Sequence, residues 1–238
     1  MTTALHDGTG TDAGAAVVVL GAGSGSRSGA EVNKVLLPLG GVPVLTRSVL
    51  DALATRGVVR VVVVVRDGES GAVADALTPH LGADASVDVV VGGDSRHASE
   101  ERALAVLADD VASGAVDVVA IHDGARPLAG SALLTRVLDA ARRHGGAVPV
   151  VPAPAVVSVD GSPVPDGLVA MQTPQAFRAD ALLAAYDAAA TSGHRATDTA
   201  GTVAAHGPDD VEVVAVDGDP ANLKITWPGD LDVASRLV

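Results

Sequence analysis

The sequence of 238 residues contains no cysteine, which excludes disulfides, thiolate nucleophiles and cysteine-ligated metals. Aromatic residues make up only 1% of the chain, with one Phe, one Tyr and one Trp. So few rings cannot form the stacking platform on which proteins bind single-stranded nucleic acid. Because apolar residues still account for 48% of the chain, the core must be built from Val, Ala and Leu.

Positive charge is also scarce, with 16 Lys and Arg against 29 Asp and Glu and a net charge of -13. Such a surface repels nucleic acid and anionic lipid, so neither is an expected partner. A phosphorylated ligand would need a local cationic pocket that opposes this field. No run reads as a transmembrane helix, and residues 1–14 lack the apolar segment of a signal peptide, so we expect a flexible tail and a cytoplasmic protein.

From residue 15 onward, short apolar runs alternate with helical patterns. The runs lie at 16–20, 58–65, 87–91, 116–121 and 147–151, and the helical patterns at 43–55, 71–80, 97–112 and 131–144. Further helices are predicted at 179–190, 198–205 and after Pro228, with a strand at 211–216. This alternation predicts an α/β fold: a single Rossmann-like domain over 15–238 with a mainly parallel central sheet and helices on both faces.

The alternation breaks at residues 152–167, which are rich in proline and contain Asp160-Gly161, a hairpin signal. We interpret this segment as a short β-arm that protrudes from the domain.

The first predicted strand is followed by a glycine loop that carries cations. Its residues are Gly21, Ala22, Gly23, Gly25, Arg27 and, seven positions further on, Lys34. Glycines here let backbone N–H groups approach phosphate oxygens closely. A dinucleotide fingerprint would need glycine where Ser26 stands, and the Gly-Lys-Ser/Thr of a Walker loop is absent. Two cations beside such a loop suit a triphosphate.

Other segments with polar side chains fall at predicted strand ends or in loops, where open α/β sheets bind ligands. Two follow predicted strands, Gly92 to Arg96 and His122 to Pro127, and two lie in later loops, Gln172 to Gln175 and Asn222 to Thr226. Each alone reads equally well as a turn or a helix start. Together, in one α/β chain, they predict a binding site.

Taken in order, these segments resemble the 2-C-methyl-D-erythritol 4-phosphate cytidylyltransferase family, from about residue 16 to the end. The family pattern contains A-A-G-x-G-x-R, P-K, G-G-x-x-R-x-x-S, H-D-A-A-R-P, T-P-Q-x-F, T-D-E-A and N-I-K-x-T. The matching segments here are Gly21 to Arg27, Asn33-Lys34, Gly92 to Ser99, His122 to Pro127, Thr173 to Phe177, Thr197 to Ala200 and Asn222 to Thr226.

The resemblance implies a transfer of CMP from CTP to 2-C-methyl-D-erythritol 4-phosphate, with release of pyrophosphate, in isoprenoid precursor synthesis. Arg27, Lys34 and Lys224 would be catalytic, because they would hold the phosphates and stabilise charge at the α-phosphorus. The nucleotide would contact Gly21, Ala22, Gly23, Gly25, Gly92, Gly93, Asp94, Ser99 and Asp123. The acceptor would contact Asp123, Arg126, Thr173 and Thr197.

The resemblance also implies Mg²⁺ held mainly through triphosphate oxygens, with no protein metal ligand assigned, and a homodimer. The chemistry is self-consistent, since a phosphate monoester oxygen is already anionic at neutral pH and needs no general base. Catalysis then consists of neutralising and aligning two anions.

The chain departs from the family at the arm. The family's Asp-Thr is replaced by Ala155-Val156, and its arm arginine has no counterpart in 163–167. Either another cation such as Arg178 takes its place, or the acceptor differs. The alternatives are therefore a cytidylyltransferase for another polyol phosphate, such as ribitol 5-phosphate, and a catalytically degenerate nucleotide-binding paralogue.

Overall fold

The computed structural model describes residues 13–23, 33–153, 156, 158–193 and 196–238. Most of the predicted tail, and Gly25 and Arg27 of the glycine loop, lie outside this part of the chain. Among the described residues, no helix is both long and apolar enough to cross a membrane.

The described residues form an eight-stranded sheet in the order β10-β7-β9-β6-β1-β4-β5, with β8 paired to β7. Its strands are β1 (Gly14–Leu20), β4 (Val58–Val65), β5 (Asp88–Val91), β6 (Val116–Asp123), β7 (Gly145–Pro152), β8 (Val169–Met171), β9 (Gln175–Arg178) and β10 (Glu212–Asp217). Neighbouring pairs are parallel except where β8 and β9 take part. The predicted mainly parallel sheet is confirmed.

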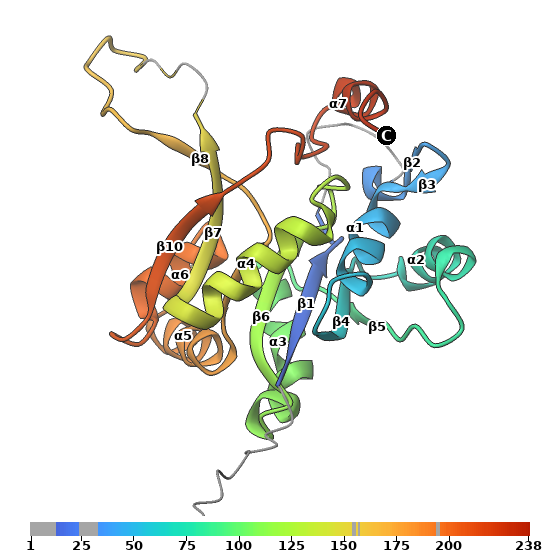
Figure 1. The fold of residues 1–238 in the computed structure, drawn as a ribbon, viewed down its shortest axis with the longest axis horizontal. Coiled ribbons are helices and arrows are strands. Elements are labelled where there is room, and N and C mark those ends of the chain that lie inside the picture. The colour runs from blue at the N-terminus through green and yellow to red at the C-terminus, as the bar shows by residue number, and fades with distance from the viewer. Residues whose placement is uncertain (1–12, 24–32, 154–155, 157, 194–195) are drawn as a thin grey trace, which may run out of the picture.

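Helices cover both faces of this sheet (Figure 1). One face packs on α1 (Val44–Leu53), α2 (Ser70–Leu77) and α4 (Gly130–His144), and the other on α3 (Arg96–Ala112), α5 (Ala179–Ser192) and α6 (Thr199–His206). The central strand β1 shows why, because Val17 and Val19 belong to the first core and Ala16 and Val18 to the second. Strands buried on both faces need continuous apolar runs, which is what the sequence provides.

A third, smaller core fixes the C-terminal segment beside α1. It joins Leu39, Val44, Ile225 and Ala234. These come from the hairpin β2 (Pro38–Leu39) and β3 (Val42–Pro43), from the start of α1, and from the segment that leads into and through α7 (Pro228–Ala234). Figure 1 shows α7 beside this hairpin. The short 3₁₀ helices are η1 (Lys34–Leu36) and η2 (Thr78–His80).

Strand β9 was not predicted, because a four-residue run that contains Gln and Arg gives no strand pattern. It inserts antiparallel between β6 and β7, pairing Ile121 with Gln175 and Val118 with Arg178. The loop that precedes β9 is thereby brought to the end of β6.

Strand β8 pairs with the end of β7, and the segment that connects these two strands projects from the body (Figure 1). Within this segment, Gly161 adopts a positive φ of 76°, and Ser162 N–H donates to Asp160 Oδ1 at 3.1 Å. The Asp160-Gly161 turn therefore lies where the sequence placed it.

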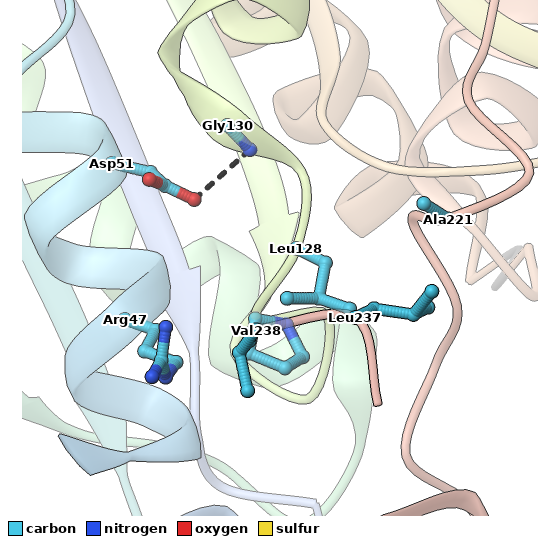
Figure 2. Close-up of a pocket in the computed structure, with 8 residues that line it drawn as sticks. Arg47, Asp51, Leu128, Gly130, Ala221, Leu237 and Val238 are labelled. Atoms are coloured by element: carbon cyan, nitrogen blue, oxygen red, sulfur yellow. Dashed lines mark hydrogen bonds between the residues drawn. The ribbon is translucent and has the colours of Figure 1, made fainter. Parts of the chain in front are cut away.

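A pocket of about 360 Å³ lies between α1, the start of α4 and residues Leu237 and Val238 (Figure 2). None of the predicted site residues lines it. In it, Asp51 Oδ2 accepts a hydrogen bond from the N–H of Gly130, the first residue of α4, at 2.9 Å. Burial raises the pKa of the Asp51 carboxyl, against the opposing effects of that hydrogen bond and of Arg47.

Asp51→Asn should keep an oxygen for Gly130 while removing a charge that burial disfavours. Because the folded-state pKa is raised, the contribution of Asp51 to stability is largest below 3.8 and declines as pH rises through the folded pKa. We expect the Asn variant to be at least as stable as wild type near pH 7. Asp51→Ala should lose about 1 kcal/mol at low pH, where the protonated carboxyl contributes most, and less near pH 7. Chemical denaturation across pH measures both, and equal losses in the two variants would refute the assignment.

Candidate active site

The predicted loops after the parallel strands meet at the carboxyl edge of the sheet. The N–H of Gly21 donates to Val64 O at 2.7 Å, and the N–H of Gly124 donates to Leu20 O at 2.9 Å. Gly92 is bound to the end of β4 in the same way. These backbone bonds hold the loops that follow β1, β5 and β6 side by side.

Asp123, the last residue of β6, is the centre of this edge. Its carboxylate lies 2.7 Å from Lys224 Nζ, forms an ion pair with Arg96 Nη1 and lies 3.8 Å from Arg126 Nε. Only 6% of Asp123 is exposed. Burial alone would raise the pKa of this carboxyl, but the charges of Arg96 and Lys224 outweigh it and hold the pKa well below its usual range. Asp123 is therefore a permanent anion that gathers three cations.

The C-terminal segment is tied to this edge through Asn222, which is fully buried. Its Nδ2 donates to Thr173 O at 2.9 Å, and its own carbonyl oxygen accepts from Arg126 Nη1 at 2.7 Å. Gln172 adds a bond from Nε2 to Asp219 O at 2.8 Å. Lys224 follows Asn222 by two residues, so these hydrogen bonds fix the position of the backbone that carries Lys224.

His122 is buried and has both ring nitrogens engaged. Nε2 faces Arg126 O at 3.2 Å, which can only accept, so Nε2 carries the proton. Nδ1 therefore accepts from the Thr173 hydroxyl at 3.2 Å, and that same hydroxyl accepts from the N–H of Asp123 at 2.9 Å. Burial lowers the pKa of His122 to about 4. This histidine is a neutral structural link and not a base.

Lys34 and Lys224 are the only two lysines in the sequence, and Lys34 reaches the backbone of the segment that carries Lys224. Lys34 Nζ donates to Thr226 O at 3.5 Å, two residues beyond Lys224. Lys34 begins η1, which Asn33 caps by accepting from Val35 N–H with its side chain. Asn33 Nδ2 also donates to Gly21 O at 3.2 Å, which ties this lysine to the glycine loop.

The loop after β5 is closed by a small, tight contact. Ser99 Oγ accepts from Gly93 N–H at 3.1 Å, and a Cβ on Gly93 would lie 2.5 Å from Ala98 Cβ. Only glycine fits there without displacing the start of α3. Asp94 is exposed beside this contact, and Ser99 is buried.

The remaining predicted residues differ in what surrounds them. Ala22 and Gly23 are described, and Gly23 O accepts from Arg66 Nη2, whereas Gly25 and Arg27 fall outside the described residues. Thr197 is exposed just before Asp198, which caps α6. The ligand contacts expected of these predicted residues, namely Ala22, Gly23, Gly25, Arg27 and Thr197, stay predictions.

Arg178 does not lie at this edge within one chain. It pairs with Val118, at the far end of β6 from Asp123, and forms an ion pair with Asp210 at 2.9 Å. It cannot replace the missing arm arginine in its own subunit.

Several residues that shape the site had no role assigned from the sequence. Arg96 was part of the quoted G-G-x-x-R-x-x-S match and could have been assigned from it. Asn33 and Asn222 adjoin predicted residues. Glu100 gave no signal, because a glutamate in the first turns of a helix normally faces solvent.

Among the described residues, no cluster of three or more His, Cys, Asp or Glu could hold a metal ion. Both oxygens of Asp123 already face cations. Asp123 therefore offers no oxygen that is remote from a cation to a metal ion.

Known proteins of one family resemble this chain in both sequence and fold. The profile of the 2-C-methyl-D-erythritol 4-phosphate cytidylyltransferase family matches residues 15–238. Proteins of that name from Cereibacter sphaeroides and Pelotomaculum thermopropionicum are 39% and 36% identical, each over 94% of this chain and over 96% and 93% of their own lengths. The crystal structure of the Thermus thermophilus protein of that name superposes with a TM-score of 0.71 at 29% identity, over 94% of this chain and 98% of that one.

A profile match over nearly the whole chain, with relatives of this identity and coverage, shows the family. The chain belongs to the 2-C-methyl-D-erythritol 4-phosphate cytidylyltransferases, which are nucleotidyltransferase enzymes.

Proposed function

We propose that this protein transfers CMP from CTP to 2-C-methyl-D-erythritol 4-phosphate and releases pyrophosphate. The observation that carries the proposal is the convergence of both lysines of the chain, with Arg96 and Arg126, on the edge where the glycine loops end. In a protein of net charge -13, such a convergence has a specific purpose, since it creates a local field that attracts phosphates.

In the proposed reaction, an oxygen of the acceptor phosphate attacks the α-phosphorus of CTP. A P–O bond to that phosphorus forms, the bond between the α-phosphorus and the bridging oxygen of the β-phosphate breaks, and pyrophosphate leaves with the electron pair. The nucleophile is already anionic, so no proton needs removal. The barrier arises from repulsion between two anions and from the charge that develops on the phosphoryl oxygens, and fixed cations lower both contributions.

Lys224 is suited to bridging the two substrates. It is 43% exposed yet held at 2.7 Å by Asp123, so its charge is positioned before any substrate arrives. We infer that an incoming phosphate shares Lys224 with Asp123, while Lys34 and Arg27 hold the triphosphate. Preorganised cations cost no reorganisation at the moment of reaction.

Nucleotide recognition is proposed for the loop after β5. The resemblance assigns the cytosine and ribose to Gly92, Gly93, Asp94 and Ser99. The fixed Gly93–Ser99 contact and the exposed Asp94 carboxylate support this assignment, because rigid backbone groups beside an available acceptor can discriminate polar base edges.

Acceptor recognition is proposed for Arg126, Thr173 and Thr197. Thr173 retains one free lone pair, because its proton goes to His122 and its other lone pair to Asp123 N–H. The Thr173 hydroxyl can therefore accept one hydrogen bond from a hydroxyl group of the substrate that receives CMP. Mg²⁺, carried on phosphate oxygens, would supply further charge neutralisation.

We also propose that two copies associate through the projecting arm. Apolar side chains on it and on the adjoining strand β8 are exposed in one chain, with Val159 of the arm fully exposed and Val169 and Met171 of β8 each 51% exposed. Apolar side chains gathered on a projecting segment favour burial against a partner.

The first test offers purified protein CTP, Mg²⁺ and a panel of phosphorylated polyols, with pyrophosphate release as the readout. We expect release with 2-C-methyl-D-erythritol 4-phosphate and at least about tenfold lower kcat/KM with ribitol 5-phosphate, because its longer chain without the methyl branch places its hydroxyls differently relative to the phosphate. Release only with another acceptor would replace the substrate in this proposal. CTP binding without turnover on any acceptor would end it.

Lys34→Ala should lower kcat roughly a hundred- to thousandfold, because it removes a positioned cation from the phosphates. The thermal melting temperature should stay close to that of wild type. Arg143→Ala is the matched control, since it removes one exposed cation from the last turn of α4. Near-normal turnover of Lys34→Ala would remove this lysine from the mechanism.

His122 should make the fold sensitive to acid. Its pKa is about 4 in the folded state against 6.5 unperturbed, so the unfolded state binds more protons between these values and stability falls as pH falls through that window. We expect a loss on the order of 3 kcal/mol relative to His122→Gln. His144→Gln, at an exposed histidine, should retain the wild-type slope. An equal slope in His122→Gln would contradict the buried neutral form.

A further inference from the structure

Glu100 is a buried carboxylate for which the proposed chemistry has no use. It lies in the second turn of α3, and its side chain is 1% exposed. Two hydroxyls donate to it, Tyr186 to Oε2 and Thr199 to Oε1 at 3.1 Å, and Arg96 forms an ion pair with it, with Nε 2.8 Å from Oε1. Such an environment satisfies the ionised form, which can only accept.

The position of Tyr186 is itself fixed. Its ring stacks on His97 with centroids 4.7 Å apart and an interplanar angle of 12°, and the residue is only 4% exposed. Burial raises the pKa of Glu100 above its usual range, although Arg96, Tyr186 and Thr199 oppose that effect. A buried carboxyl group held by three neighbouring side chains is a fixed point in the structure.

Arg96 connects this fixed point to the active site. One side of its guanidinium contacts Glu100, and Nη1 contacts Asp123. Burial would lower the pKa of Arg96, but the two carboxylates together raise it. Arg96 lies between two carboxyl groups, so Asp123 is not its only partner. Asp123 can therefore also attract Lys224 and Arg126.

Glu100 also joins the two halves of the site. Its own helix begins at the loop proposed for the nucleotide, whereas Thr199 begins α6, two residues after Thr197 of the proposed acceptor pocket. Glu100 of α3 therefore contacts Tyr186 of α5 and Thr199 of α6, and it links these three helices beside the proposed substrate site.

We propose that Glu100 is a positioning residue for the transfer reaction: it orients Arg96, and through it Asp123, and sets the start of α6 for acceptor binding. This inference rests on the proposed function. The competing explanation is that the cluster only stabilises the core, as buried polar groups can.

Glu100→Gln tests the role with little change in volume. The Gln amide carries no charge, and its –NH₂ group would face at least one of the groups that now donate to Glu100. We expect KM for the acceptor to rise about five- to tenfold while KM for CTP changes less than about twofold. Tyr186→Phe should shift acceptor KM in the same direction by less. Asp109→Asn, at an exposed position of the same helix, is the matched control and should behave as wild type.

A second variant separates positioning from packing. The triple change Glu100→Met, Tyr186→Phe and Thr199→Val replaces the polar cluster by apolar groups of similar size, which buried sites often accept without loss of stability. Positioning predicts a folded enzyme whose acceptor KM is still raised at least about fivefold, because Arg96 has lost its second anion.

The outcomes are distinguishable. A fall in kcat with both KM values unchanged means less active protein and overturns the inference in favour of a core role. Wild-type kinetics in the triple variant overturn it as well. If the wild-type enzyme releases no pyrophosphate with this acceptor, the proposed function fails first, and the inference falls with it.

Discussion

The attraction between Asp123 and three cations is the interaction on which this site depends. A protein of net charge -13 must collect positive charge at one point if it is to bring two phosphorylated molecules together, and like charges in a shared pocket repel one another. A single buried carboxylate resolves the conflict, since it holds Lys224, Arg96 and Arg126 within one cluster. Its depressed pKa keeps it charged throughout the physiological range, so the cations are assembled before any ligand binds.

The topology of the sheet delivers these groups from distant parts of the sequence. Parallel strands bring the loops after β1, β5 and β6 to one edge, and the antiparallel insertion of β9 adds Thr173 beside His122 and Asp123. The C-terminal segment then crosses this edge, anchored by buried Asn222 and by the small core around Ile225. Lys34 thereby contacts the backbone two residues beyond Lys224, although 190 positions separate the two lysines in the chain.

Much of this could be predicted from the sequence, because Val-rich runs that end at glycines report both the strands and the loops that follow them. The mainly parallel sheet and the helices on both faces were predicted in this way. Strand β9 was not, because its four residues owe their conformation to partners on both sides and not to local pattern. Asp123, Arg126 and Lys224 were predicted from motifs. Their mutual contacts, the link through Arg96 and the buried state of Glu100 depend on tertiary packing that no local signal records.

The central claim is that Lys34 and Lys224 are poised for phosphates at one shared position. A crystal structure of the protein with CTP and Mg²⁺ measures this most directly. The account predicts that both Nζ atoms lie within about 4 Å of triphosphate oxygens, with Lys224 still in contact with Asp123. A bound triphosphate whose oxygens approach neither lysine, with Lys224 directed away from the α-phosphate, would contradict it.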